Sequence, residues 1–346
     1  MIKERDRFRS IRKGLATFIL LLLIFPGQLD GQAADEVASV TITVSNIEES
    51  ISFFTDVLDF RMSSEIMEIY GNELNNLFGI DKEGLKIKEV KLALGTEKIE
   101  LIQFIEPATG RAIPADSKSN DLWFQHIAIV TSNMDSAYAQ LRRHKVVFVS
   151  SSPQTLPDYI PAAAGIKAFY FRDPDGHNLE VIDFPEDKGN PKWQDSEKGI
   201  FLGIDHTAIG ISDTESSTSF YRDLIGLTVA GVSENFGTEQ EHLNQVFGAH
   251  LVITGLKAPK GFGVEFLDYL APPGGRKYYA DSEPYDLWHW HTTIRLSGIQ
   301  ILYDKLKNLD YPIVSNGITD IGNLVTGGDK GFLVRDPDGH AILITE

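Results

Sequence analysis

The chain has 346 residues, of which 42% are hydrophobic and 10% aromatic, so the composition excludes a disordered chain and allows one or two hydrophobic cores. Its formal net charge is −17 and it has no basic stripe, which argues against nucleic-acid binding, because an acidic surface repels phosphate backbones. The absence of cysteine excludes disulfides, thiolate metal ligands and cysteine nucleophiles. Any chemistry must therefore use His, Asp, Glu or Tyr.

Residues 1–33 have the order of a secretory signal peptide. Basic residues precede an apolar run at 15–25, and small residues follow at Gly31 and Ala33. The run is shorter than the roughly 20 residues of a membrane-spanning helix, with an uncleaved anchor as the alternative. We expect cleavage near Ala33, export to the periplasm or the cell exterior, and no stable membrane insertion afterwards. An intact mass of the native protein that includes residues 1–30 would contradict this expectation.

From residue 36 onward, a pattern of one strand, one helix and further strands occurs four times. The first unit is predicted to contain a strand at 37–44, a helix at 46–59 and a closing strand at 99–102. The second unit is predicted to contain a strand at 125–130, a helix at 133–144 and a hairpin at 166–184. A charged stretch with Pro and Gly, residues 185–198, follows and is typical of a linker.

The second half of the chain repeats this order. The third unit is predicted to contain a strand at 204–211, a helix from Asp213 and a closing strand at 264–267. The fourth is predicted to contain a strand at 290–296, a helix at 298–309 and a hairpin at 331–345.

Both hairpins contain the same six residues, Arg-Asp-Pro-Asp-Gly-His, at 172–177 and at 335–340. Pro fixes φ for a turn, Asp can cap the turn, and Gly supplies the positive φ of a tight hairpin. We therefore predict a chain reversal at each copy. His177 and His340 fall in these turns, where we expect them to be solvated.

Three histidines and three glutamates lie inside apolar strands, at corresponding places in the units. A buried carboxylate without a partner costs several kcal/mol, so each glutamate requires a partner or a metal. Imidazole nitrogens and carboxylate oxygens together suit Zn, Fe, Mn, Co or Ni. The candidates are His126, His206, His291, Glu100, Glu180 and Glu265.

The fourfold βαβββ pattern resembles the vicinal oxygen chelate superfamily, which groups glyoxalase I, bleomycin-resistance proteins and extradiol dioxygenases. The resemblance covers nearly all of residues 36–346. It implies an α+β fold of tandem βαβββ units paired into half-barrel cavities, with domains at 36–185 and 201–346 and a linker at 186–200. It also implies a divalent metal held by the first strand and by a glutamate of the last strand of each unit. Ser39 and Leu343 stand where two of these ligands are expected.

The sequence allows two pairings of the units. Pairing of neighbours would give two sites that each lack one ligand, Glu100 with His126 and Glu180, and His206 with Glu265 and His291. Pairing of unit two with three and of unit one with four would instead give one full set, His126, Glu180, His206 and Glu265, and leave Glu100 and His291 together. We favour the second hypothesis, because the losses then collect in one place.

Three functions are compatible with the resemblance. The first is a metal-dependent enzyme of isomerase or lyase type, in which Glu180 or Glu265 acts as a base on a small oxygenated molecule. The alternatives are an extradiol-type dioxygenase and a bleomycin-resistance-like protein that binds a small molecule without turnover. We rank the metal-dependent enzyme first and expect a monomer or a homodimer.

Other polar and aromatic residues are weaker candidates. Arg111 and Arg276 could hold an acidic substrate group, but we expect them to pair with Asp116 or Asp281. Aromatic side chains in and beside strands are expected in the core rather than in catalysis, and these are Tyr170, Tyr269, Trp123, Trp288 and Trp290.

Overall fold

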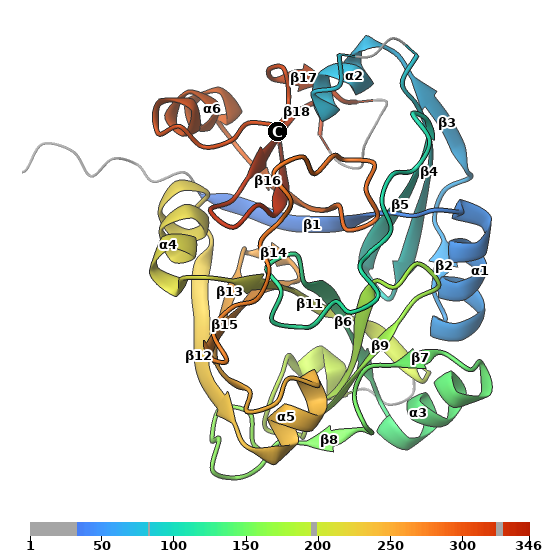
Figure 1. Ribbon diagram of the computed structural model, residues 1–346, viewed down its shortest axis with the longest axis vertical. Coiled ribbons are helices and arrows are strands. Elements are labelled where there is room, and N and C mark those ends of the chain that lie inside the picture. Colours follow the sequence, from blue (N-terminus) through green and yellow to red (C-terminus); the bar gives the residue numbers. More distant parts are fainter. Residues whose placement is uncertain (1–32, 82–83, 195–198, 323–327) are drawn as a thin grey trace, which may run out of the picture. The chain divides into compact units, whose positions relative to one another are not determined.

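The computed structural model describes residues 33–81, 84–194, 199–322 and 328–346 (Figure 1). The predicted signal peptide therefore lies outside the described residues, apart from Ala33. Residues 32–346 form one compact unit. Within the described ranges, no helix is both long enough and apolar enough to cross a membrane.

The described strands form two mixed β-sheets, as expected for an α+β fold. Sheet A has, in spatial order, β17 (Thr319–Asp320), β18 (Lys330–Arg335), β19 (Ala341–Thr345), β16 (Trp290–Leu296), β1 (Ala34–Thr43), β5 (Glu97–Glu106), β4 (Lys86–Leu94) and β2 (Arg61–Met62), with β3 (Met67–Tyr70) beside β4 and β14 (Lys260–Gly261) beside β1. Sheet B has β12 (Thr228–Phe236), β13 (His250–Lys257), β15 (Gly263–Ala271), β11 (Phe201–Ile211), β6 (Gln125–Thr131), β10 (Asn178–Asp183), β9 (Lys167–Arg172) and β7 (Val147–Phe148), with β8 (Gln154–Thr155) beside β9.

Three of the described helices begin at the capping residues that the sequence indicates. The side chains of Asn46, Asn133 and Asp213 accept hydrogen bonds from the backbone N–H three residues later, which satisfies one free donor of each first turn. The helical elements are α1 (Ile47–Leu58), α2 (Asn72–Phe78), α3 (Met134–Arg143), the 3₁₀ turn η1 (Pro191–Gln194), α4 (Thr214–Thr218), the π-helical segment η3 (Ser219–Leu224), α5 (Thr238–Asn244) and α6 (Ile299–Asn308). Helices α1 and α3 lie side by side in Figure 1, and Gln140 Nε2 of α3 donates to Val57 O of α1 at 3.0 Å.

The sheets join units that are not neighbours in the chain. β1 of the first unit pairs antiparallel with β16 of the fourth, and β6 of the second pairs antiparallel with β11 of the third. The swapped pairing is therefore confirmed. The segments 36–185 and 201–346 each contribute strands to both sheets, so the sheets do not coincide with these halves of the sequence.

Both predicted hairpin turns form, but the prediction that His177 and His340 are solvated is wrong. Their exposed fractions are only 1% and 2%. His177 Nδ1 lies 2.7 Å from Asp173 Oδ2 and its Nε2 lies 2.7 Å from Leu287 O, so both ring nitrogens contact an acceptor. The turns are buried because they dock against the other sheet, a tertiary contact that the turn motif does not encode.

The second aspartate of each repeat makes that docking contact. Asp175, in the turn between β9 and β10 of sheet B, accepts hydrogen bonds from Ser45 N and Oγ at 2.8 and 2.5 Å. Ser45 lies between β1 of sheet A and α1. Asp338, in the turn between β18 and β19 of sheet A, accepts hydrogen bonds from Ser212 N and Oγ at 2.8 and 2.6 Å. Ser212 lies between β11 of sheet B and α4. The repeat therefore reverses the chain and also holds the two sheets together.

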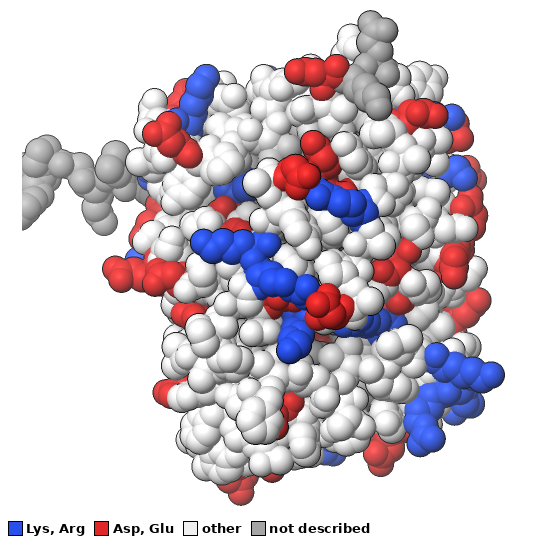
Figure 2. Space-filling view, in the orientation of Figure 1, with Lys and Arg blue, Asp and Glu red and all other residues white. Residues whose placement is uncertain are grey.

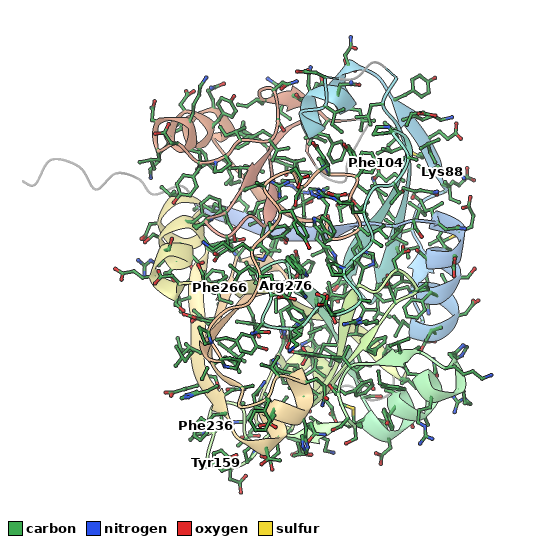
Figure 3. All side chains as sticks on the ribbon, in the orientation of Figure 1. Lys88, Phe104, Tyr159, Phe236, Phe266 and Arg276 are labelled. Atoms are coloured by element: carbon green, nitrogen blue, oxygen red, sulfur yellow. The ribbon has the colours of Figure 1, made fainter. Side chains whose placement is uncertain are left out.

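The connecting segments cross over in the same reciprocal way. Arg111 forms ion pairs with Asp281 at 2.9 Å and Asp286 at 2.7 Å, and Arg276 forms the equivalent pairs with Asp116 and Asp121 at the same distances. Both arginines thus pair with carboxylates, as expected, but each with the aspartates of the other connecting segment and not with the one nearby in the sequence. Arg276 lies near the centre of Figure 3. On the face in Figure 2, a group of adjoining basic side chains lies near the centre beside acidic ones, and acidic and other basic side chains are spread over the rest of the face. The aromatic residues expected in the core are buried: Tyr170, Tyr269, Trp123, Trp288 and Trp290.

Candidate metal centre

Four adjacent strands of sheet B each contribute one of the predicted ligands. His126 lies on β6, Glu180 on β10, His206 on β11 and Glu265 on β15. Glu180 pairs with Ala128 and Glu265 pairs with Ala208, and each alanine follows a candidate histidine by two positions. Since side chains two apart on a strand, and side chains of paired residues, point to one face, all four ligands share a face of the sheet.

The four side chains converge on one another. Glu180 Oε2 lies 3.1 Å from His126 Nε2 and 3.6 Å from His206 Nε2. His206 Nε2 is 3.4 Å from Glu265 Oε2. Ligand atoms about 2.0–2.2 Å from one ion are separated by roughly 3.0–3.5 Å, so these spacings fit a shared divalent metal. Donor atoms of His126, Glu180 and His206 all lie within 4.8 Å of one another.

The charge states of the cluster are set by burial and by the mutual contacts. Burial alone would raise the pKa of Glu180, but hydrogen bonds from His126 and His206 outweigh it and lower that pKa to about 2. Burial lowers the pKa of His126. For His206, the opposing effects of Glu265, Asp205 and Glu180 outweigh burial and raise the pKa well above its ordinary value. In the absence of a metal, these carboxylates favour the protonated form of His206.

Glu265 differs from Glu180 in accessibility. Its side chain is 29% exposed, against 7% for Glu180, and the accessible part lies in the wall of a cavity of about 160 Å³. Burial among other charges raises the pKa of Glu265. Both carboxylates line the cavity, and Glu265 is the more accessible of the two to a molecule inside it.

Asp205 is a site residue that the sequence analysis missed. Its carboxylate lies 3.1 Å from His206 Nδ1 and accepts a hydrogen bond from Trp193 Nε1 at 2.6 Å. A neighbour of His206 would normally point to the opposite face, but the pairing of β11 with β6 shifts register between Ile204 and His206, which places Asp205 on the side of the cavity. Asp205 therefore orients the imidazole of His206, as an outer partner of a metal ligand does. The sequence did contain a signal for this residue, because Asp205 is a charged residue inside an otherwise apolar strand.

The two remaining candidates, Glu100 and His291, lie together on sheet A in a much smaller space. They line a cavity of about 10 Å³, room for about one water molecule. Glu100 accepts hydrogen bonds from Ser39 Oγ at 3.3 Å and Thr41 Oγ1 at 3.1 Å. Burial lowers the pKa of His291 to about 3. Within the described residues, the only group of three or more side chains placed for a metal ion is the one on sheet B.

Sheet A also carries a carboxylate that the sequence analysis did not single out. Glu89 is 2% exposed, and burial together with the charge of Glu100 raises its pKa to about 8. At neutral pH its carboxyl is mainly protonated. Leu343 on sheet A pairs with Thr293, just as Glu265 on sheet B pairs with Ala208. Sheet A therefore has a leucine at the position that corresponds to the ligand candidate Glu265.

Comparisons with known proteins agree with this geometry. A curated 2-epi-5-epi-valiolone epimerase from Actinomyces sp. is 28% identical over 164 residues, which cover 47% of this chain and 85% of that protein. Glyoxalase I from Zea mays superposes with a TM-score of 0.57 at 12% identity, covering 90% of this chain and 92% of that chain. A putative dioxygenase from Bacillus subtilis superposes with a TM-score of 0.56 at 13% identity, covering 91% and 86%. At such identities the structures show a shared fold alone.

The strongest comparison is with a family model. The model for the Glyoxalase/Bleomycin resistance protein/Dioxygenase superfamily matches residues 36–181 and 203–344, which include all four metal-ligand candidates of sheet B. Because the match covers most of the sequence in both halves, the chain belongs to the Glyoxalase/Bleomycin resistance protein/Dioxygenase superfamily.

Proposed function

We propose that this protein is a divalent-metal-dependent enzyme of the isomerase or epimerase type, which acts on a small oxygenated molecule in the cavity of sheet B. The observation that carries the proposal is the convergence of His126, Glu180, His206 and Glu265 at the wall of that cavity. The similarity to an epimerase supports this reaction class. Zn, Fe, Mn, Co and Ni all accept such ligands.

The residues of the site have different roles in this proposal. A divalent ion in this site would polarise a substrate oxygen and acidify the adjacent C–H group. Glu180, whose pKa is about 2 because two imidazoles contact it, stays ionised and serves as a fixed ligand. Glu265 reaches the cavity and has a raised pKa, which suits a group that takes and returns a proton. Asp205 holds the His206 ring in place.

Inversion of a carbon centre needs a proton donor on the face opposite the base. Glu180 and Glu265 lie on β10 and β15, the outer two of the four strands, with both histidine strands between them. The two carboxylates therefore approach the cavity from opposite sides of the histidines. We assign Glu265 as the base. Glu180 stays ionised as a ligand on the other side of the histidines, so the proton for the opposite face must come from another donor, such as solvent in the cavity.

Proton exchange with solvent tests this proposal. We expect the metal-loaded protein in D₂O to replace the α-hydrogen of at least one member of a panel of small ketones and hydroxyketones, as followed by NMR. Glu265→Gln should lower the exchange rate by about 10²–10⁴-fold, the usual contribution of a general base. Glu106→Gln, at an exposed position on the same chain, is the matched control and should leave the rate unchanged. A protein that binds metal but exchanges no panel member would favour the binding-protein alternative.

A further inference from the structure

The cavity of sheet B has a mixed lining. Its apolar part includes Ile166, Ile253 and Leu267. Its polar part, called the polar wall below, comprises Ser233 and Asn235 of β12 and Gln240 of α5. An apolar lining with a small number of placed polar groups is typical of a small-molecule site in which the polar groups fix the ligand's orientation.

The polar wall belongs to a continuous chain of hydrogen bonds. Ser233 Oγ donates to Asn235 Oδ1, and Asn235 Nδ2 donates to Gln240 Oε1 at 2.9 Å. Gln240 Nε2 donates to Asn244 Oδ1, and Asn244 Nδ2 donates to Tyr269 Oη. The same contacts also form with all three carboxamides flipped, because the hydroxyls of Ser233 and Tyr269 at the two ends can donate or accept; in either direction, the oxygen and one N–H of each wall amide are engaged.

Each of these NH₂ groups has a donor to spare. A carboxamide carries two N–H bonds, and the chain uses one of them at Asn235 and one at Gln240. Across the described residues, neither nitrogen has a second acceptor, although Asn235 is 2% exposed and Gln240 is 1% exposed. Buried N–H groups are almost always paired, so the cavity offers two donors to a ligand oxygen. Ser233 Oγ keeps a free lone pair in either direction and offers it to a ligand hydroxyl.

The charges of the lining disfavour an anionic ligand. No Lys or Arg lines the cavity within the described part of the chain, whereas Asp205, Glu180 and Glu265 do. With a divalent ion bound, both histidines neutral and all three carboxylates ionised, the net charge of the lining would still be −1. A phosphate or carboxylate group would enter this space without a cationic side chain to compensate its desolvation.

The volume sets the size of the ligand. The cavity measures about 160 Å³, close to the roughly 150 Å³ of an engineered cavity that holds one benzene ring. From the lining, the charges and the volume, we infer that the site takes an uncharged ring-sized carbonyl compound that carries hydroxyl groups, and that Asn235 and Gln240 bind those oxygens. This inference rests on the proposed function, because it names the substrate class of the same site.

Calorimetry with three ring-sized probes tests the inference: scyllo-inosose, an uncharged hydroxylated cyclohexanone; cyclohexanone, which lacks the hydroxyls; and shikimate, a hydroxylated ring with a carboxylate. The metal-loaded full chain should bind scyllo-inosose at least ten-fold more tightly than either other probe. Gln240→Met and Asn235→Leu should each weaken scyllo-inosose binding by about ten-fold, the effect of one lost hydrogen bond, without changing the affinity for cyclohexanone. Gln103→Met, the same substitution outside the cavity, should have no effect.

Three results would overturn the inference: equal or tighter binding of shikimate, no binding of scyllo-inosose, or unchanged scyllo-inosose affinity in the folded variants. Ser233→Ala is a milder third variant for the case in which a carboxamide substitution prevents folding, and it should also weaken the binding of scyllo-inosose. The metal content of each protein is measured alongside. Metal binding without scyllo-inosose binding refutes this inference alone, whereas amide-dependent scyllo-inosose binding without any metal refutes the proposed function alone.

Discussion

Replacing Glu180 by Gln, or His206 by Ala, is expected to weaken one and the same metal site by at least ten-fold, about 1.4 kcal/mol. Glu180 Oε2 lies 3.1 and 3.6 Å from the two imidazole nitrogens, so either substitution removes a donor from the middle of the cluster. Titration of the metal-free protein with Zn²⁺ or Mn²⁺, followed by calorimetry, measures the effect.

The matched controls lie on sheet A, where the pseudo-equivalent residues Glu100 and His291 line a space of about 10 Å³. Glu100→Gln and His291→Ala should leave the affinity of the tight site unchanged, because Ser39 and Thr41 already bond the Glu100 carboxylate. If titrations instead revealed two sites, one weakened by Glu180→Gln and the other by Glu100→Gln, the assignment of a single working site to sheet B would be wrong.

The second large effect is on stability and concerns His177. Its side chain and that of Asp173 are both fully buried, and their closest atoms are 2.7 Å apart. Because His177→Ala leaves a buried carboxylate without its charged partner, we expect the free energy of unfolding to fall by about 3–5 kcal/mol. Urea denaturation measures this loss. His144→Ala, at an exposed position, is the control and should change the stability by less than about 0.5 kcal/mol.

The pH dependence of this contribution has a defined sign. Burial alone would lower the pKa of His177, but the charge and hydrogen bond of Asp173 outweigh it and raise the pKa. A group with a raised folded pKa stabilises the protein fully below its unfolded value, near ~6.5, and loses that contribution as the pH rises through the folded value. The stability gap between the wild type and His177→Ala should therefore be largest in mildly acid solution and shrink above neutrality. A gap that grows with pH would contradict the charged pair.

The local elements could be predicted from the sequence because short-range chemistry determines them. Asn46, Asn133 and Asp213 set the helix starts, and the Pro-Asp-Gly turns set the hairpins. The ligand candidates were visible as charged residues inside apolar strands. The pairing of the units was not determined locally, since the connecting segments are long enough for either arrangement; only the distribution of lost ligands favoured the swapped one.

What the sequence could not show are the consequences of tertiary contacts. His177 is buried because Leu287 of another unit accepts its hydrogen bond, and no feature of the turn motif indicates that partner. Asp205 faces the cavity because of a register shift between two strands that meet only in the folded chain. The space around Glu100 and His291 is small because Leu74, Leu77 and Phe78 line it.

Metal analysis of the purified protein tests the central claim most directly. The protein is expressed in medium supplied with Zn, Mn, Fe, Co and Ni, and its metal content is determined by mass spectrometry beside that of the Glu180→Gln variant. The account predicts about one divalent ion per chain in the wild type and a large loss of it in the variant, because four candidate ligands converge on sheet B, whereas sheet A has only Glu100 and His291 beside a much smaller cavity. A wild-type protein without bound metal, or one whose metal content is unchanged in Glu180→Gln, would contradict the account.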